Sequence, residues 1–305
     1  MVNFREWFDE NLKRLRIYYA AAGFEISFEQ FVGLFLGISF AVFIVLLLLH
    51  LSLLVSAVAF LTFMSFVVSI PLTIRNNRVE ALETNLPDAL KHMALVLKAG
   101  GTTEAALEEV ANAEYGPLSA DLKKSLSQLK EGKTFDAVLE EAAQHSGSIL
   151  FQRTVRILLD AKRAGGGLAD VMFSIAEDAR DLLHIKRERI SRTTMHVMFL
   201  FVSGVVLAPF IFGFSVSIVH YINQGISSAL PNSKVSSLCT LNLVLTLFLV
   251  VQTLIAAAAI GLIRAGRMTK YVLYAPVMVL ASLIIFEAGK FMSSLIVGGS
   301  VIACG

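Results

Sequence analysis

The chain has 305 residues, of which 56% are hydrophobic and 16% are charged, and its formal net charge is +2. Soluble globular domains carry roughly 25% charged residues, and the mean hydropathy of +0.71 is far above their usual range. With two cysteines in addition, these numbers exclude an ordinary cytosolic enzyme, a disordered regulator and a secreted disulfide scaffold.

The charged residues are segregated along the chain. Apart from Lys234, Glu287 and Lys290, the 26 basic and 24 acidic residues all lie in residues 1–30, 75–194 and 264–270. A bilayer core needs about 20 apolar residues per helix, and the uncharged stretches supply that length. The pattern predicts an all-α polytopic membrane protein with about five transmembrane helices and one large cytoplasmic insert that forms a six-helix bundle.

Residues 1–30 are predicted to be a cytoplasmic amphipathic segment. Large apolar side chains recur there at helical spacing, with charged residues on the other faces; they are Phe4, Trp7, Phe8, Leu12 and Leu15. Such a helix either lies in the membrane interface or packs on the insert, and both alternatives stay open. No cleavable signal peptide is visible in these residues.

Residues 31–74 are long enough for a transmembrane hairpin of two spans. The turn is expected near residues 50–52, and Pro71 near the exit of the second span. Three more spans are expected in the membrane domain 195–305; they are residues 195–220, which include Pro209, and residues 241–263 and 271–297.

The distribution of basic residues predicts the orientation. A cytoplasmic N-terminus places 24 of the 26 Lys and Arg residues inside, and the short loop 264–270 alone carries three of them. We therefore expect a multi-pass protein of the cell membrane with a cytoplasmic N-terminus and insert. Five spans put the C-terminus outside, although the glycine-rich last segment leaves the span count open.

The insert, residues 75–194, is predicted to form helices throughout. Six apolar stripes have helical spacing, and they begin near Leu86, Ala106, Leu118, Phe135, Phe151 and Leu168. Gly-containing turns separate them at residues 100–102, 132–134 and 165–167, where Gly can end a helix and Thr can cap the next one. The pattern from Gly101 to Ala111 recurs 31 residues later, which favours a compact bundle of helix pairs.

The sixth helix of the insert is predicted to continue into the third span. Neither Gly nor Pro occurs between Leu168 and Gly204, and at 1.5 Å per residue this stretch is on the order of 55 Å long. It is a strut that transmits displacement, a plain juxtamembrane helix whose basic residues contact lipid phosphates, or both at once.

No constellation in the sequence indicates catalysis, a cofactor or a metal. The GKT triplet at residues 132–134 lacks the earlier Gly and the strand of a phosphate-binding loop, because Ser127 stands at the Gly position. The six histidines show no metal-ligand spacing. We therefore expect a protein that is not an enzyme, with no catalytic residue, no cofactor site and no metal site.

Two features of the membrane domain are singled out. Glu287 and Lys290 lie three residues apart in the last span and so share a helix face; they are either a structural pair or have a transport or assembly role. Cys239 and Cys304 both fall at outer ends of spans in the predicted topology, where they either form a disulfide or stay isolated thiols.

Several short motifs resemble the type II secretion system F domain family. They are Asn85–Leu90, Leu97–Gly100, Ala105–Glu108, Gly166–Leu168 leading through Ile175–Glu177 and Arg180 to Arg187 and Arg189, and the segment Leu15–Gly23 before the first span. The resemblance covers roughly residues 10–225. It implies a polytopic membrane platform protein of type IV pilus-like machines, which include bacterial secretion and tight-adherence systems and archaeal pilus and archaellum assemblies.

The resemblance also implies partners. The cytoplasmic bundle of such proteins engages a hexameric secretion ATPase, and the membrane part guides prepilin-like subunits into a filament or pseudopilus. A chain with one such domain is expected to pair with itself or with a sister protein and to contact membrane lipid. Because the net charge is only +2, we expect it to bind no nucleic acid. ATPase-contact candidates are exposed basic residues of the late helices: Arg153, Arg156, Lys162, Arg163, Arg187 and Arg189. For each, an ordinary solvated surface is the alternative.

Two other functions stay open. The first is a membrane transporter or channel that uses Glu287, Lys290 and the Pro-containing spans, although no inverted repeat is visible. The second is a membrane-tethered signalling adaptor whose helical insert binds a soluble partner. The sequence leaves three points open. They are the identity of the filament, the bacterial or archaeal source, and the choice between a homo-oligomer and a hetero-oligomer.

Overall fold

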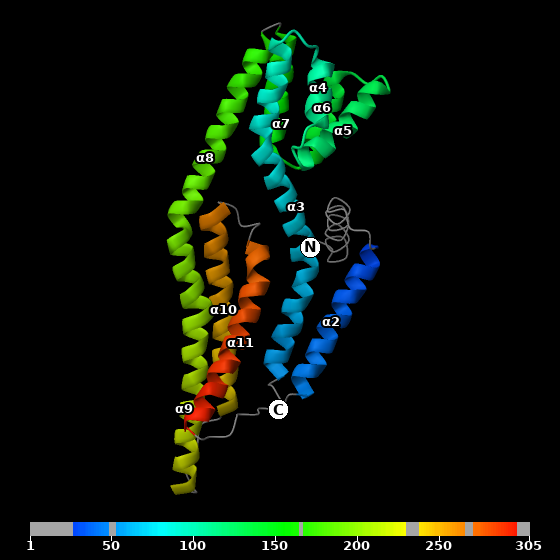
Figure 1. Ribbon diagram of the computed structural model, residues 1–305. Helices are drawn as coiled ribbons and strands as arrows, with labels where there is room; N and C mark the ends of the chain where they lie inside the picture. Colours follow the sequence, from blue (N-terminus) through cyan, green and yellow to red (C-terminus); the bar gives the residue numbers. More distant parts are fainter. Residues whose placement is uncertain (1–26, 49–52, 165–166, 230–237, 266–270, 298–305) are drawn as a thin grey trace, which may run out of the picture. The chain divides into compact units, whose positions relative to one another are not determined.

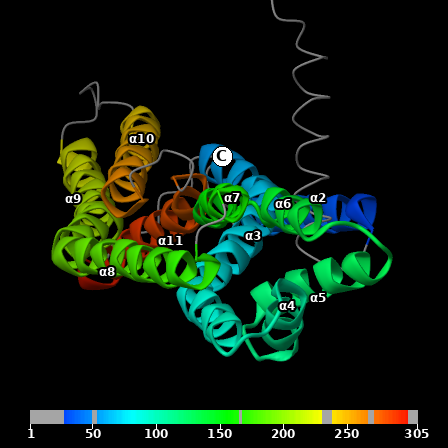
Figure 2. The same cartoon turned by 90° about the horizontal axis from the view of Figure 1, so that it is seen from above.

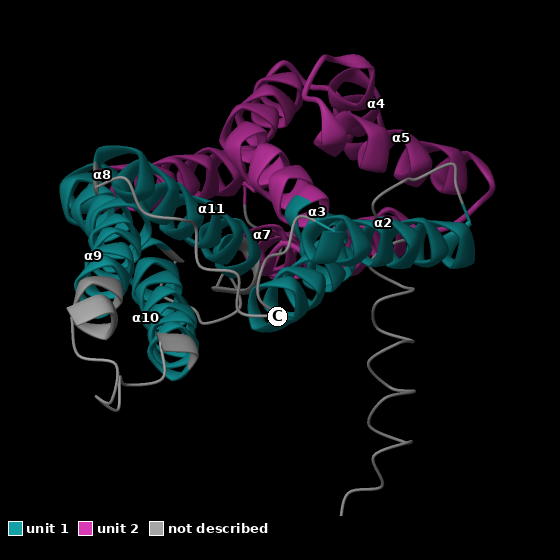
Figure 3. Cartoon of the chain, turned by 90° about the horizontal axis from the view of Figure 1, so that it is seen from below, with its two compact units in different colours: residues 1–73, 190–305 teal, residues 74–189 magenta. Residues whose placement is uncertain are grey.

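A computed structural model describes residues 27–48, 53–164, 167–229, 238–265 and 271–297 (Figure 1). Within these ranges every regular element is a helix and no strand occurs, which confirms the all-α prediction. The chain divides into two compact units, residues 1–73 with 190–305 and residues 74–189 (Figure 3). The amphipathic segment predicted at residues 1–30 falls almost entirely outside the described residues, as does the hairpin turn at 50–52.

Unit 1 contains the membrane-length helices. Its elements are α2 (Phe28–Leu48), the first half of α3 (Leu53–Lys98), the end of α8 (Leu168–Phe201), the π-helix η1 (Val202–Leu207), α9 (Ala208–Ala229), α10 (Leu238–Ala265) and α11 (Tyr271–Val297). Five of the described helices are long and apolar enough to cross a membrane. The expectation of about five transmembrane helices is thereby confirmed.

The helices α9, α10 and α11 pack on one another in unit 1 (Figure 2). One buried cluster joins Val216 of α9, Leu249 of α10 and Phe286 of α11. A second cluster joins Val205 of η1, Ala257 of α10 and Met278 of α11. Many other apolar side chains of this unit are exposed in the structure, which is expected where lipid rather than water is the neighbour.

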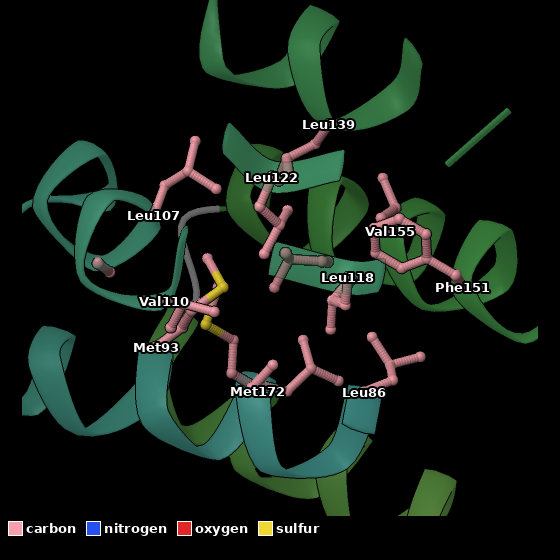
Figure 4. Packing of buried hydrophobic residues seen from close by; sticks show 14 of the residues in the cluster. Leu86, Met93, Leu107, Val110, Leu118, Leu122, Leu139, Phe151, Val155 and Met172 are labelled. Atoms are coloured by element: carbon pink, nitrogen blue, oxygen red, sulfur yellow. The ribbon is translucent and has the colours of Figure 1, made fainter. Parts of the chain in front are cut away.

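Unit 2 is a helical bundle with a single hydrophobic core (Figure 4). It comprises the second half of α3, α4 (Thr103–Asn112), α5 (Pro117–Lys130), α6 (Phe135–Ser146), α7 (Ile149–Arg163) and the first part of α8. Every one of these helices contributes side chains to the core; the largest that are fully buried are Leu82, Leu86, Leu107, Leu118, Leu158 and Met172.

The turns of unit 2 follow the predicted capping chemistry. The hydroxyl of Thr102 accepts the backbone N–H of Ala105 at 3.2 Å, and that of Thr134 accepts the N–H of Ala137 at 3.3 Å. Gly132 precedes the second cap with a φ of 98°, a left-handed conformation that a side chain would disfavour. These local contacts end one helix and begin the next within a few residues.

Two helices contribute residues to both units. The helix α3 continues through Pro71 without a break, so the second span and the first helix of the insert are one element. The helix α8 runs without a break into η1 and then α9, which confirms the predicted helical continuity from Leu168 to Gly204. The π-helix was not anticipated. In it the N–H of Ala208 bonds the carbonyl of Ser203, and the next residue, Pro209, has no N–H to offer.

Candidate functional site

The predicted basic candidates divide between α7 and α8 of unit 2. Lys162 and Arg163 are engaged in ion pairs: Lys162 Nζ lies 2.6 Å from Asp136 Oδ1 and 4.8 Å from the centre of the Phe135 ring, and Arg163 Nη1 lies 3.7 Å from Asp160 Oδ1. The Lys162 charge is therefore held against α6. Arg153, Arg156, Arg187 and Arg189 are exposed.

Two grooves flank α7. The first, of about 100 Å³, lies between α6 and α7 and has a polar rim that includes Glu140, Gln144, Gln152, Arg156 and Arg163. The second, of about 270 Å³, lies between α7 and α8, and Arg153 is its basic residue. The structure therefore assigns neighbouring arginines of one helix to two different grooves.

The motif residues from Asn85 to Leu90 connect helices within unit 2. The Asn85 side-chain amide donates to the Tyr115 carbonyl at 3.1 Å, and the Asp88 carboxylate pairs with the Arg180 guanidinium. Leu86, Ala89 and Leu90 are buried in the core. This motif therefore ties α3 to the loop before α5 and to α8, and its role in the described residues is structural.

Sequence reasoning did not find the contacts of Glu83. Its carboxylate accepts the Ser148 hydroxyl at 2.9 Å and lies 3.6 Å from Lys186 Nζ. The Ser148 hydroxyl also caps α7 by accepting the N–H of Phe151 at 3.0 Å. One acidic side chain thus joins α3, the start of α7 and α8, three segments whose proximity no local pattern signals.

Three ionisable groups of unit 2 have shifted pKa values. The pKa of Glu104 is lowered because its carboxylate accepts its own backbone N–H at the start of α4. The pKa of Glu141 is lowered by hydrogen bonds from Lys133 and Gln128. Burial raises the pKa of Tyr115, and the nearby Asp88 adds to this effect. All three shifts follow from contacts within unit 2.

The polar pair of the last span is formed in the structure. Lys290 Nζ lies 2.6 Å from Glu287 Oε1 and 4.8 Å from the centre of the Phe286 ring. Lys290 is only 5% exposed, and its carbonyl accepts the Ser217 hydroxyl of α9 at 3.2 Å. The pair therefore lies inside the helix packing of unit 1 rather than on a solvated end.

Among the described residues, no group of three or more His, Cys, Asp or Glu side chains lies where it could hold a metal ion. Cys239 belongs to α10, whereas Cys304 lies outside the described residues. The disulfide and the pair of isolated thiols therefore both stay open as alternatives.

These observations define a class: a multi-pass membrane protein with a helical unit between its second and third membrane-length helices. Residues 89–215 match the family model of the type II secretion system (T2SS), protein F. The match runs from the end of α3 through unit 2 and into α9. The resemblance found in the sequence is thereby confirmed for this part of the chain, which carries a T2SS F domain.

The chain is also similar to two proteins of Methanocaldococcus jannaschii. It is 25% identical over 204 residues to uncharacterized protein MJ0779, a match that covers 66% of this chain and 68% of that protein. It is 26% identical over 121 residues to uncharacterized protein MJ1286, and this match covers 40% of this chain and 20% of that protein. No solved structure matches the chain.

Proposed function

We propose that this protein is a non-enzymatic platform of the cell membrane for a type IV pilus-like filament or secretion pseudopilus. In this role it couples a cytoplasmic secretion ATPase to the insertion of prepilin-like subunits. The observation that carries the proposal is the T2SS F domain at residues 89–215, on a chain with five membrane-length helices. Proteins with this domain are membrane platforms that work with secretion ATPases and pilin-like subunits.

The proposed topology places the N-terminus and unit 2 in the cytoplasm. Its support is that 24 of the 26 Lys and Arg residues lie in residues 1–30, in the insert and in the loop 264–270. The short loop carries most weight, because the rule holds best for short loops. In this topology an ATPase in the cytoplasm can contact unit 2, which carries most of the charged residues of the chain.

The ATPase surface that we propose is the groove between α6 and α7. Arg156 and Arg163 line it together with the amides of Gln144 and Gln152 and the carboxylates of Glu140 and Asp160. Arginine and amide groups offer several hydrogen-bond donors to an acidic partner surface. Lys162 and Arg163 contribute less than Arg156, because Asp136 pairs with Lys162 and Asp160 pairs with Arg163. Arg187 and Arg189 on α8 extend the set of exposed basic candidates.

The proposed coupling element is the helix that runs from α8 through η1 into α9. It contains no break from Leu168 to Ala229, and a helix is stiff along its axis. Displacement of unit 2 by the ATPase would therefore reach the third membrane span directly.

Binding of the ATPase tests the proposal. The full chain in lipid nanodiscs is titrated with the hexameric secretion ATPase of the same organism. The doubly substituted variant Arg156→Glu with Arg163→Glu is expected to bind at least tenfold more weakly. The matched control is Lys123→Glu with Lys124→Glu on the exposed face of α5, which should bind as the unchanged chain does. Absence of binding by the unchanged chain would refute the platform role.

A second experiment addresses the coupling element. Two Pro residues substituted at His184 and Glu188, neither of which is an ATPase-contact candidate, each remove a helix hydrogen bond and bend α8. Filament assembly or secretion in cells should be lost while ATPase binding persists. Two Ala substitutions at the same positions control for loss of the side chains. Unchanged assembly in the proline variant would show that α8 does not transmit displacement.

A further inference from the structure

The groove between α7 and α8 is lined by three exposed aliphatic side chains. Ile157 is 41% exposed, Leu182 is 47% exposed and Ile185 is 61% exposed, and all three line this groove of about 270 Å³. Ile149, one turn before Arg153 on α7, is 59% exposed as well. Contiguous exposed aliphatic side chains on a soluble surface mark an interaction site.

The two walls of the groove carry opposite charge. The α7 wall presents Arg153 between apolar residues, whereas the α8 wall presents Asp178 and Asp181 beside Leu182. All three charged side chains are exposed. Within the parts of the chain that the structure describes, none of the three takes part in an ion pair. The groove therefore has an apolar floor, one basic wall and one acidic wall.

We propose that this groove is the surface through which two copies of the chain pair. In a two-fold contact the same patch meets itself, so each residue of one wall faces the other wall of the partner. A two-fold axis between α7 and α8, parallel to both, sets Arg153 of each copy opposite the partner's Asp178 and Asp181. The same contact covers Ile157, Leu182 and Ile185 of both copies.

The distribution of charge selects a second copy over other occupants. A partner surface of one sign would satisfy one wall and repel the other, whereas a copy of the same groove supplies both signs in the required order. Like charges placed opposite each other cost several kcal/mol. The platform role proposed above already expects two copies of the chain to pair, and this groove gives that pairing a defined surface. The argument for the surface comes from the residues of the groove.

Complementary charge reversal tests the pairing in the full chain, in nanodiscs or mild detergent. The Arg153→Asp variant makes both walls acidic, and the Asp178→Arg with Asp181→Arg variant makes both walls basic. Each variant alone should self-associate at least tenfold more weakly than the unchanged chain. An equal mixture of the two, carrying different affinity tags, should pair again, because each wall then meets its opposite. Circular dichroism and melting of each variant show whether it is folded.

Crosslinking supplies a readout that needs no charge reversal. In chains with Cys239→Ser and Cys304→Ser, an equal mixture of an Ile149→Cys chain (α7) and a Leu182→Cys chain (α8) should form a mixed covalent dimer on mild oxidation, because each wall faces the other wall of the partner. The Leu95→Cys variant, at a 56% exposed site on α3, should form no such dimer.

Each of the following results would overturn the proposal: a monomeric unchanged chain, charge variants that pair as the unchanged chain does, or no recovery of pairing in the mixture of the two charge variants. Protection of the Leu182→Cys thiol in a monomer by residues 1–26 or by an added ATPase would also overturn it, since either would be the occupant instead. Because the readout is self-association, its failure leaves the ATPase-binding test unaffected.

Discussion

Gly213 of α9 lies directly against the backbone of Phe286 in α11. A Cβ atom at position 213 would stand 2.2 Å from the Phe286 carbonyl oxygen and 3.1 Å from the Lys290 amide nitrogen. The contact is reciprocal, because a Cβ at Gly289 would stand 2.7 Å from the Phe210 carbonyl oxygen. Small residues let membrane helices approach this closely, and here they bring Ser217 within reach of the Lys290 carbonyl.

Substitution of Gly213 is therefore expected to separate α9 from α11. The Gly213→Ala variant should lose about 1–3 kcal/mol of stability, as overpacked interiors do, and Gly213→Val should lose more. Thermal melting of the full chain in detergent, followed by circular dichroism, measures the loss. Gly33→Ala on α2 is the control, since a Cβ there meets nothing within 4 Å. Equal melting of the Gly213→Ala and Gly33→Ala variants would contradict the close contact.

The Glu287–Lys290 pair predicts a difference between single and double substitutions. Lys290→Met leaves the Glu287 carboxylate without its ammonium partner in a largely buried position, and should destabilise the chain on the order of 3 kcal/mol. Replacing both residues, as Glu287→Leu with Lys290→Met, removes the unpaired charge and should recover most of that loss. Melting curves of the three chains decide this. A double variant as unstable as the single one would mean that the pair has a role beyond mutual neutralisation.

Glu83 is expected to matter for unit 2 although it lines neither of the two grooves beside α7. The Glu83→Ala variant removes the acceptor of the buried Ser148 hydroxyl and a partner of Lys186. Loss of such a partner costs roughly 1–3 kcal/mol, so the melting temperature should fall by several degrees. Glu109→Ala on the exposed face of α4 is the matched control. Hydrogen exchange at the first turn of α7 should increase in the Glu83 variant alone.

The lowered pKa of Glu141 predicts an acid-dependent contribution to stability. The folded state favours the carboxylate, which Lys133 and Gln128 bind. Its contribution is complete above the ordinary pKa of 4.5 and is lost as the pH falls below that value through the lower folded pKa. The Glu141→Gln variant should therefore lose less stability than the unchanged chain between pH 5 and about pH 3. Melting temperatures across this range measure the difference, with Glu140→Gln as the control. Parallel curves for the unchanged chain and the Glu141→Gln variant would refute it.

Much of the secondary structure could be predicted because its causes are local. Helical spacing, Gly turns and the Thr102 and Thr134 caps depend on residues within one or two turns of each other. The state of the predicted ATPase-contact residues could not be predicted in this way. Whether such a side chain is exposed or ion-paired depends on residues of other helices. Asp136 of α6 neutralises Lys162, and Arg153 and Arg156 line separate grooves, neither of which the spacing along α7 could indicate.

By itself the amino-acid sequence determined that this is an all-helical membrane chain with a polar helical insert, because hydropathy and periodicity are properties of contiguous residues. Tertiary structure alone decided which side chains meet: Gly213 with the Phe286 backbone, Glu83 with Ser148 and Lys186, and the opposed charged walls of the α7–α8 groove. These contacts join residues far apart in the chain. They depend on how helices pack, a property that no short stretch of sequence contains.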